Sequence, residues 1–248
     1  MKQVILGIKF ALSYFTVLPI HFGANDDLSQ PKVLSNMLLT LPFIGLLLSA
    51  LTLGIFVSFE SLGWLAAIIA SVLYMALYGF IHTEAIIDVT DAVYAKHSGK
   101  DPYAIIKEPG VGAMGVLYGV SFLLLKIAAL STLLMYHLFI PFMAIAAISR
   151  ISLLVLIRTY EFRSSFVSQL KESLYFVPLT VLLLIYGALA WWFLSWPGLA
   201  LFGLGIVSAL LLSTLAKKTL GFINGDVLGM SLEGVEFILI LAVLLACI

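Results

Sequence analysis

The chain has 248 residues, of which 62% are hydrophobic and only 10% are charged, and its formal net charge is zero. A soluble domain is usually about half apolar and about a quarter charged, so this composition predicts burial in a lipid bilayer. The balanced charge gives no basic excess of the kind that binds nucleic acid. A single cysteine excludes an internal disulfide, and no Cys/His spacing indicates a zinc site.

The amino-terminal segment has some features of a secretory signal, because Lys2 and Lys9 accompany an apolar run that ends near Pro19. Lys9 interrupts this run, however, and no small-residue cleavage pattern follows it. We therefore expect a retained helix that lies at the membrane interface or dips into the membrane as a re-entrant segment.

The rest of the chain contains several apolar runs, each close to the 20 residues or so that a spanning helix needs. The runs lie between Lys32 and Glu60, between Glu60 and Glu84, on either side of a turn near His137, on either side of Trp196-Pro197-Gly198, and at about 227–248. We predict an all-α, polytopic transmembrane bundle of about seven spans. No linker or repeat divides it, so residues 1–248 are expected to form one integral membrane domain.

The distribution of lysine and arginine predicts the orientation, because cytoplasmic loops carry an excess of these residues. The turns near Glu60, His137 and Trp196 contain neither, and they alternate with segments that do. We therefore place the two longest polar stretches, about 82–110 and 216–236, in the cytoplasm. These stretches also hold most of the carboxylates. They are expected to form the functional site of a multi-pass protein in a bacterial or archaeal plasma (inner) membrane.

An acidic stripe continues directly from one of the hydrophobic spans. Glu84, Asp88 and Asp91 have i, i+4, i+7 spacing, which places their side chains on one face of a helix. Like charges at this spacing repel each other, and more strongly near a bilayer, unless a cation binds. Hard oxygen ligands without thiols favour Mg²⁺, or alternatively Mn²⁺, over zinc. The alternative is a solvated helix face at the membrane edge. His82 lies on roughly the opposite face and is a doubtful ligand for the same ion.

A second acidic segment lies on the same predicted side of the membrane. It reads Asn224-Gly225-Asp226-Val227-Leu228-Gly229, and Glu233 and Glu236 follow it. Its glycines permit close approach of a ligand. Asp226 is expected to complete a metal site or to bind a substrate hydroxyl. The alternative is a simple turn that opens the last helix, with Asp226 near the helix N-terminus.

Residues 110–115 match the dinucleotide-binding pattern G-x-G-x-x-G. No strand precedes them and they open a membrane helix, so that interpretation fails. Backbone N–H groups at Gly110 and Gly112, with Lys107 upstream, are candidates to hold a phosphate; close helix packing through small residues is the alternative. Lys126 and Arg150 fall in mid-span, where they are expected to neutralise acidic groups or to line a path.

Segments along most of the chain resemble the cobalamin synthase family, the adenosylcobinamide-GDP ribazoletransferases. Ser13–Pro19 resembles the family's opening segment, and Leu41–Gly45 resembles its first span. The matches to its H-x-D-G-x-x-D-x-x-D-G and G-D-x-L-G patterns are His82, Asp88, Asp91 and Gly225–Gly229. The departures are Glu84 for aspartate, Ala85 and Ala92 for glycine, and Gly110 for arginine.

The resemblance implies a late step of adenosylcobalamin biosynthesis, in which α-ribazole or its 5′-phosphate is joined to adenosylcobinamide-GDP and GMP is released. The hypothesis that follows is a Mg²⁺-dependent phosphotransferase. Its expected metal ligands are Glu84, Asp88, Asp91 and Asp226. Its expected catalytic residues are His82, Asp88, Asp91 and Asp226. Lys107, Gly110 and Gly112 are expected near phosphate, and a homo-oligomer is left open.

Two other functions are left open by the sequence. Asp88–Lys96 approaches the motif of the CDP-alcohol phosphotransferases, but that motif's later glycine and two further aspartates are missing. A transporter would use Lys126 and Arg150 as part of an ion path. Against a transporter, the acids collect at the predicted cytoplasmic edge rather than at the midplane, and the hydropathy has no inverted repeat.

Overall fold

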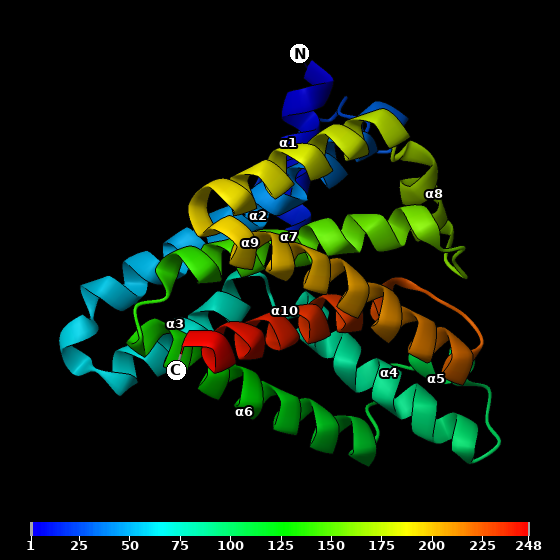
Figure 1. The fold of residues 1–248 in the computed structure, drawn as a ribbon. Coiled ribbons are helices and arrows are strands. Elements are labelled where there is room, and N and C mark those ends of the chain that lie inside the picture. The colour runs from blue at the N-terminus through cyan, green and yellow to red at the C-terminus, as the bar shows by residue number, and fades with distance from the viewer. Residues whose placement is uncertain (1, 248) are drawn as a thin grey trace.

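The computed structural model describes residues 2–247, and all the regular elements in this range are helices (Figure 1). The predicted all-α class is therefore confirmed. In chain order the elements are α1 (Lys2–Phe15), α2 (Pro31–Ser58), the 3-10 turn η1 (Glu60–Leu62), α3 (Trp64–Leu77), α4 (Ile81–His97), α5 (Pro102–Ile106), α6 (Ala113–Met135), α7 (Phe139–Thr159), α8 (Ser165–Ser173), α9 (Phe176–Leu220) and α10 (Gly225–Cys247).

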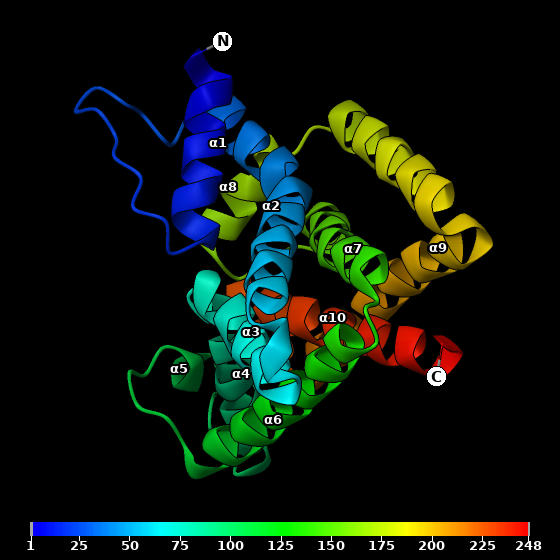
Figure 2. The same ribbon diagram turned by 90° about the vertical axis from the view of Figure 1, so that its left-hand side faces the viewer.

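Helix α1 lies crosswise to the long helices and packs on α2 (Figures 1 and 2). It has 14 residues, too few to cross a bilayer. Gly7 allows close contact between the two helices, because a Cβ there would lie 2.5 Å from the Cβ of Asn36. Helix α1 is therefore not one of the candidate spans, and its expected place at the membrane interface or as a re-entrant segment stays a prediction.

Five helices, α2, α6, α7, α9 and α10, are long and apolar enough to cross a membrane. The pair α3 and α4 adds a sixth candidate that is bent by 80°. The bend follows Tyr78, where Gly79 and Phe80 both have positive φ angles, of 65° and 55°. A non-glycine residue rarely adopts this conformation, so Phe80 marks a sharp change of chain direction.

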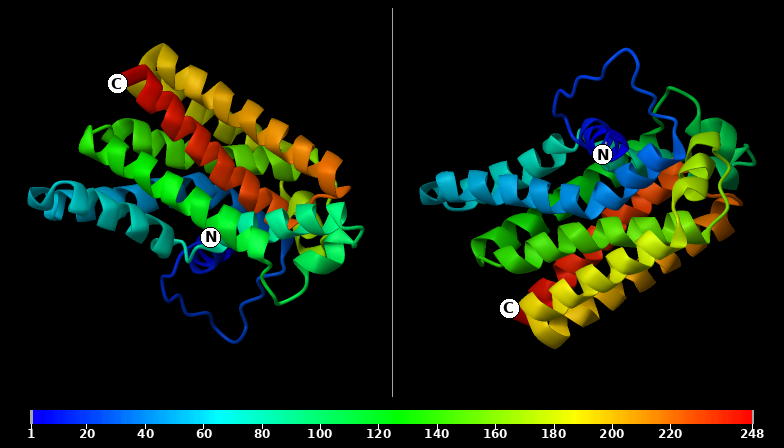
Figure 3. Two further views of the ribbon diagram at one scale, coloured as in Figure 1. Left: turned by 90° about the horizontal axis from the view of Figure 1, so that it is seen from below. Right: turned by 90° about the horizontal axis from the view of Figure 1, so that it is seen from above.

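Helix α9 is two arms rather than one rod. Ser195 leaves the helical conformation, with φ 54° and ψ −140°, and the chain then turns back along the bundle (Figures 1 and 3). This break directly precedes the predicted one at Trp196-Pro197-Gly198. A Cβ at Gly198 would overlap the carbonyl oxygen of Ala190, so glycine is needed where the arms meet. Counting the arms separately reproduces the predicted number of about seven spans.

The two ends of the bundle carry different elements (Figure 3). One end holds η1, the α6–α7 turn and the break in α9. There Glu60 Oε1 lies 3.6 Å from His137 Nε2, so two of the turns predicted to face the same side are in contact. The opposite end, the polar end, holds α5, α8, the end of α4 and the starts of α6 and α10.

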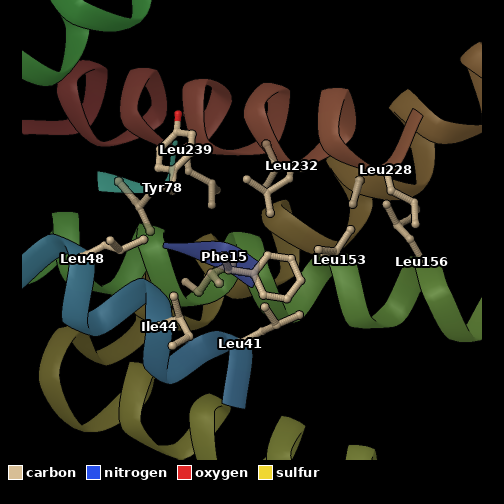
Figure 4. Close-up of a cluster of buried hydrophobic side chains, with 14 of the residues drawn as sticks. Phe15, Leu41, Ile44, Leu48, Tyr78, Leu153, Leu156, Leu228, Leu232 and Leu239 are labelled. Atoms are coloured by element: carbon tan, nitrogen blue, oxygen red, sulfur yellow. The ribbon is translucent and has the colours of Figure 1, made fainter. Parts of the chain in front are cut away.

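The spans are held together by a continuous apolar core. Leu41 and Ile44 of α2, Leu153 of α7 and Leu232 of α10 are all buried and face one another, and Phe15 of α1 reaches the same cluster (Figure 4). Between helices in lipid, such contacts stabilise mainly through close van der Waals packing. The core fixes α2, α7 and α10 relative to one another. The candidate site lies outside this core, at the polar end.

Candidate active site

The start of α10 packs directly against α4, which brings the two acidic segments together. A Cβ at Gly229 would lie 2.9 Å from the Cβ of Ala85 and 3.5 Å from His82 Nδ1, so only glycine permits this approach. Asp226 lies three residues before Gly229 on α10, and Glu84 directly precedes Ala85 on α4, so both carboxylates flank this contact. The expected convergence of two distant stretches is therefore observed, although most of each stretch is helix rather than loop.

Three of these carboxylates have no cationic partner among residues 2–247. Glu84 is exposed, and Asp88 and Asp226 are half-buried. None of the three forms an ion pair with a lysine or arginine in the described chain. Asn224 donates a hydrogen bond of 2.6 Å to Asp226, and Asn224 Oδ1 also accepts one from the Val227 N–H. The expected turn that opens the last helix is thus present, and it holds Asp226 on the side facing α4.

Asp91 is held differently from the other members of the acidic stripe. Its two carboxylate oxygens accept hydrogen bonds of 2.6 and 2.7 Å from the N–H groups of Gly112 and Gly115, at the start of α6. Negative charge is favourable at a helix N-terminus, so this contact fastens α6 to α4. Each oxygen keeps a free lone pair, and the assignment of Asp91 as a metal ligand stays a prediction.

The glycines of α6 serve close helix packing. A Cβ at Gly112 would come within 2.5 Å of the Asp91 carboxylate, and one at Gly119 within 2.5 Å of Ile87 Cγ1. Close packing is therefore observed at Gly112, Gly115 and Gly119 but not at Gly110, and the anion at this N-terminus is the chain's own Asp91. Gly110 is exposed nearby, and Lys107 Nζ lies 4.3 Å from the centre of the Tyr103 ring. A phosphate contact at Lys107 and Gly110 stays a prediction.

The carboxylates suit a hard divalent ion by their chemistry. Across the described part of the chain, no three acidic, histidine or cysteine side chains come close enough to form a ready-made metal site. Mg²⁺ commonly takes only one or two carboxylates and completes its shell with substrate phosphates and water. One or two of Glu84, Asp88 and Asp226 would suffice for such an open site, and the assignment of these three as metal ligands stays a prediction.

Glu233 and Glu236 do not belong to this acidic site, although the sequence places them beside it. Both are buried, and both pair with Lys126, with 2.7 Å between Lys126 Nζ and Glu236 Oε2. Arg150 pairs with Glu236 as well. The prediction that Lys126 and Arg150 neutralise acidic groups is confirmed, and the acids are these two glutamates of α10. We call these four residues the buried charge network.

Polar side chains complete the buried charge network, and almost nothing in the sequence indicated their role. The Tyr78 hydroxyl donates to Glu233 at 2.6 Å and the Thr83 hydroxyl at 3.1 Å. The Tyr74 and Ser149 hydroxyls donate to Glu236 at 2.8 and 3.1 Å. The one available signal was the i, i+4 spacing of Tyr74 and Tyr78 in an apolar span, which places both on one helix face.

A cavity of about 160 Å³ lies beside the acidic site and is lined by residues of α1, α2, α4, α7, α8 and the start of α10. His82 and Asp226 are part of its wall. The His82 ring lies 6.1 Å from the Phe15 ring, centre to centre, and within residues 2–247 its nitrogens have no hydrogen-bond partner. A second cavity of about 260 Å³, between α7 and the first arm of α9, is lined by apolar side chains and Tyr186 and holds no carboxylate or imidazole.

These features define an integral membrane protein with an acidic site and an adjoining cavity at one end of its bundle. A sequence model of the cobalamin-5-phosphate synthase family matches residues 7–245, and the chain belongs to this family. The chain is 32% identical to an adenosylcobinamide-GDP ribazoletransferase of Clostridium perfringens (strain ATCC 13124), over 96% of both chains. It is 28% identical to one of Desulforamulus reducens, again over 96% of both, and 29% identical to one of Acinetobacter baumannii, over 93% of both. No solved structure matches it.

Proposed function

We propose that the chain is an adenosylcobinamide-GDP ribazoletransferase, a transferase that joins α-ribazole or its 5′-phosphate to adenosylcobinamide-GDP and releases GMP. The family match over residues 7–245 carries this proposal. The structure supports it with paired acidic segments at one end of the bundle, because a reaction at a diphosphate needs charge neutralisation and exact placement of two substrates.

The reaction forms one bond to phosphorus and breaks another. A ribose hydroxyl of the acceptor attacks the phosphorus next to the cobinamide, and the bond to the GMP oxygen breaks. Glu84, Asp88 and Asp226 are the residues that would hold Mg²⁺, and Asp91 is kept as a further candidate. The ion would neutralise charge on the diphosphate as GMP leaves. His82 or a carboxylate accepts the hydroxyl proton, and the unpartnered nitrogens of His82 suit this role.

The polar end of the bundle is proposed to face the cytoplasm. Its segments carry Lys96, Lys100, Lys107, Arg158, Arg163, Lys171, Lys217 and Lys218. The turns at Glu60, His137 and Trp196 carry no lysine or arginine. An excess of these residues marks cytoplasmic segments. A site on that side would meet nucleotide substrates where they are made.

Turnover by the purified protein tests the proposal. The protein in detergent is incubated with adenosylcobinamide-GDP, α-ribazole and Mg²⁺, and GMP and the cobamide product are quantified. We expect equal amounts of both, and a loss of at least about a hundredfold for Asp88→Asn, because an amide is a poor ligand for a hard cation. Glu172→Gln, outside the site, is the matched control and should keep full activity.

The alternatives give different results in the same system. GMP release at the wild-type rate by Asp88→Asn would refute the role of this carboxylate. A wild-type protein that releases no GMP but transfers a phosphoalcohol from a CDP-alcohol would instead be a CDP-alcohol phosphotransferase. Uptake of a corrinoid into proteoliposomes without turnover would identify a transporter.

A further inference from the structure

The cavity beside His82 has the composition of a binding pocket for an aromatic, mostly apolar group. Its wall combines Phe15 and Tyr14 of α1, Phe166 of α8 and leucines of α2, α7, α8 and α10. Figure 4 shows Phe15, Leu41 and Leu153, three of the lining residues, close to one another. Small-molecule sites are typically concave and apolar, with a few placed polar groups.

Aromatic rings approach the cavity from separate elements. The Tyr14 and Phe166 rings lie 5.8 Å apart, centre to centre, across the contact between α1 and α8. The His82 ring lies 6.1 Å from Phe15 at the α4 side. Flat ligands stack favourably on such rings. Phe166 is placed by the start of α8, where Ser164 caps the helix by accepting the Val167 N–H at 3.4 Å.

Few ionisable side chains line the cavity, and one of them also belongs to the acidic site. They are His82 and Asp226, together with the Tyr14 phenol. Asp226 also belongs to the acidic site, so the cavity opens where the reaction is proposed to occur. A ligand seated in the cavity would therefore present its polar end to the carboxylates.

The parts of the two substrates can be compared with this cavity. A corrin ring is far larger than about 160 Å³. A guanine base carries hydrogen-bonding groups along its edges, and an apolar wall would leave them unsatisfied. The residues that line the cavity include no lysine or arginine to pair with a diphosphate. The base of α-ribazole, a dimethylbenzimidazole, is flat and apolar, and it is joined to a ribose with hydroxyl groups.

We propose that this cavity binds the benzimidazole base of the ribazole acceptor, stacked among Tyr14, Phe15 and Phe166, with the ribose directed toward His82 and Asp226. The assignment rests on the proposed function. It gives the transverse helix α1 and the short helix α8 a role in acceptor recognition, and it makes their aromatic residues determinants of base specificity.

Steady-state kinetics with each substrate varied in turn tests the assignment. Phe166→Ala removes one stacking ring, and Phe166→Tyr keeps it. The loss of one base–aromatic stack corresponds to roughly tenfold to a hundredfold weaker binding. We therefore expect the KM for α-ribazole to rise by about that factor in Phe166→Ala, and by less than about threefold in Phe166→Tyr. The KM for adenosylcobinamide-GDP should change by less than about twofold in both variants.

A matched control and a second acceptor sharpen the test. Phe176 is 66% exposed and does not line the cavity, so Phe176→Ala should leave both KM values unchanged. An acceptor with an unmethylated benzimidazole loses two buried methyl groups and should be used about tenfold less well by the wild type. Phe166→Ala should reduce that discrimination, which a loss of folding alone would not do.

The possible outcomes distinguish a failure of the cavity assignment from a failure of the proposed function. If the wild type makes GMP and a cobamide but Phe166→Ala leaves the KM for α-ribazole unchanged, the cavity assignment is wrong and the function stands. If only the KM for adenosylcobinamide-GDP rises, the cavity binds the nucleotide donor and the assignment is again overturned. If the wild type produces no cobamide, the proposed function itself fails.

Discussion

Replacing Lys126 with methionine gives a direct test of the buried charge network. Lys126 is fully buried, and within residues 2–247 it is the only cation paired with Glu233, whereas Glu236 also pairs with Arg150. Methionine fills a similar volume without charge. Removing one partner of a buried ion pair costs about 3–5 kcal/mol, because the other charge is left uncompensated.

The structure indicates that the cost of Lys126→Met lies at the low end of this range. Glu233 keeps its hydrogen bonds from Tyr78 and Thr83, which offset part of the loss. We therefore expect Lys126→Met to lower the free energy of unfolding by about 3 kcal/mol. The double variant Lys126→Met/Glu233→Gln removes both charges and leaves Arg150 paired with Glu236. It should cost less than about 2 kcal/mol, so the two substitutions couple instead of adding.

Unfolding in mixed micelles measures these differences. The protein is titrated with sodium dodecyl sulfate, and the transition is followed by the fluorescence of its four tryptophans and by circular dichroism. Lys171→Met, which breaks the surface pair with Glu161, is the control and should cost less than about 1 kcal/mol. A cost below about 1 kcal/mol for Lys126→Met, or a double variant as unstable as the sum of its parts, would refute the reasoning.

Two further predictions concern helix packing and the metal. Gly115→Ala places a methyl group against the Asp91 carboxylate and 2.8 Å from the Ile87 carbonyl oxygen, so it should cost about 1–3 kcal/mol in the same unfolding assay. Gly54→Ala, with no neighbour within 4 Å, should be neutral or slightly stabilising, and equal effects of the two would contradict the packing argument. Excess EDTA should abolish GMP release, and Mg²⁺ or, less well, Mn²⁺ should restore it. Turnover that persists in EDTA would exclude a role for the ion.

Chain direction was predictable from the sequence where proline or charge marks a turn. Pro197 cannot donate the hydrogen bond of a continuing helix, and α9 breaks at Ser195, two residues before it. The 80° bend between α3 and α4 was not predicted, and the acidic stripe was expected to continue straight from its span. Only Gly79 hinted at the bend, and the left-handed conformation of Phe80 depends on the surrounding packing.

The partners of the buried cations could not be read from the sequence. Lys126 and Arg150 were recognisable in the sequence as charges in mid-span, but their partners were not. Glu233 lies 107 residues beyond Lys126. Proximity in the sequence assigned Glu233 and Glu236 to the acidic segment near Asp226. About two and three turns further along the helix, however, a residue lies in the interior rather than at the membrane surface, since each residue rises by about 1.5 Å. Which helices meet there depends on tertiary packing.

Asp226, Gly229, Glu233 and Glu236 form a single stripe along α10, because their spacing of three, four and three residues keeps them on one helix face. Asp226 stands at the polar end, Gly229 touches Ala85 and His82 of α4, and Glu233 accepts the hydroxyl of Thr83, the neighbour of His82. The contact between Glu233 and Thr83 therefore helps to hold α10 in register with α4, and this register sets how close Asp226 comes to Asp88. Where the related pattern has glycine at position 85, this chain has alanine, so the close contact depends on Gly229 alone. A motif that reads as one acidic segment thus combines the proposed metal-binding end with the interior contact that positions it.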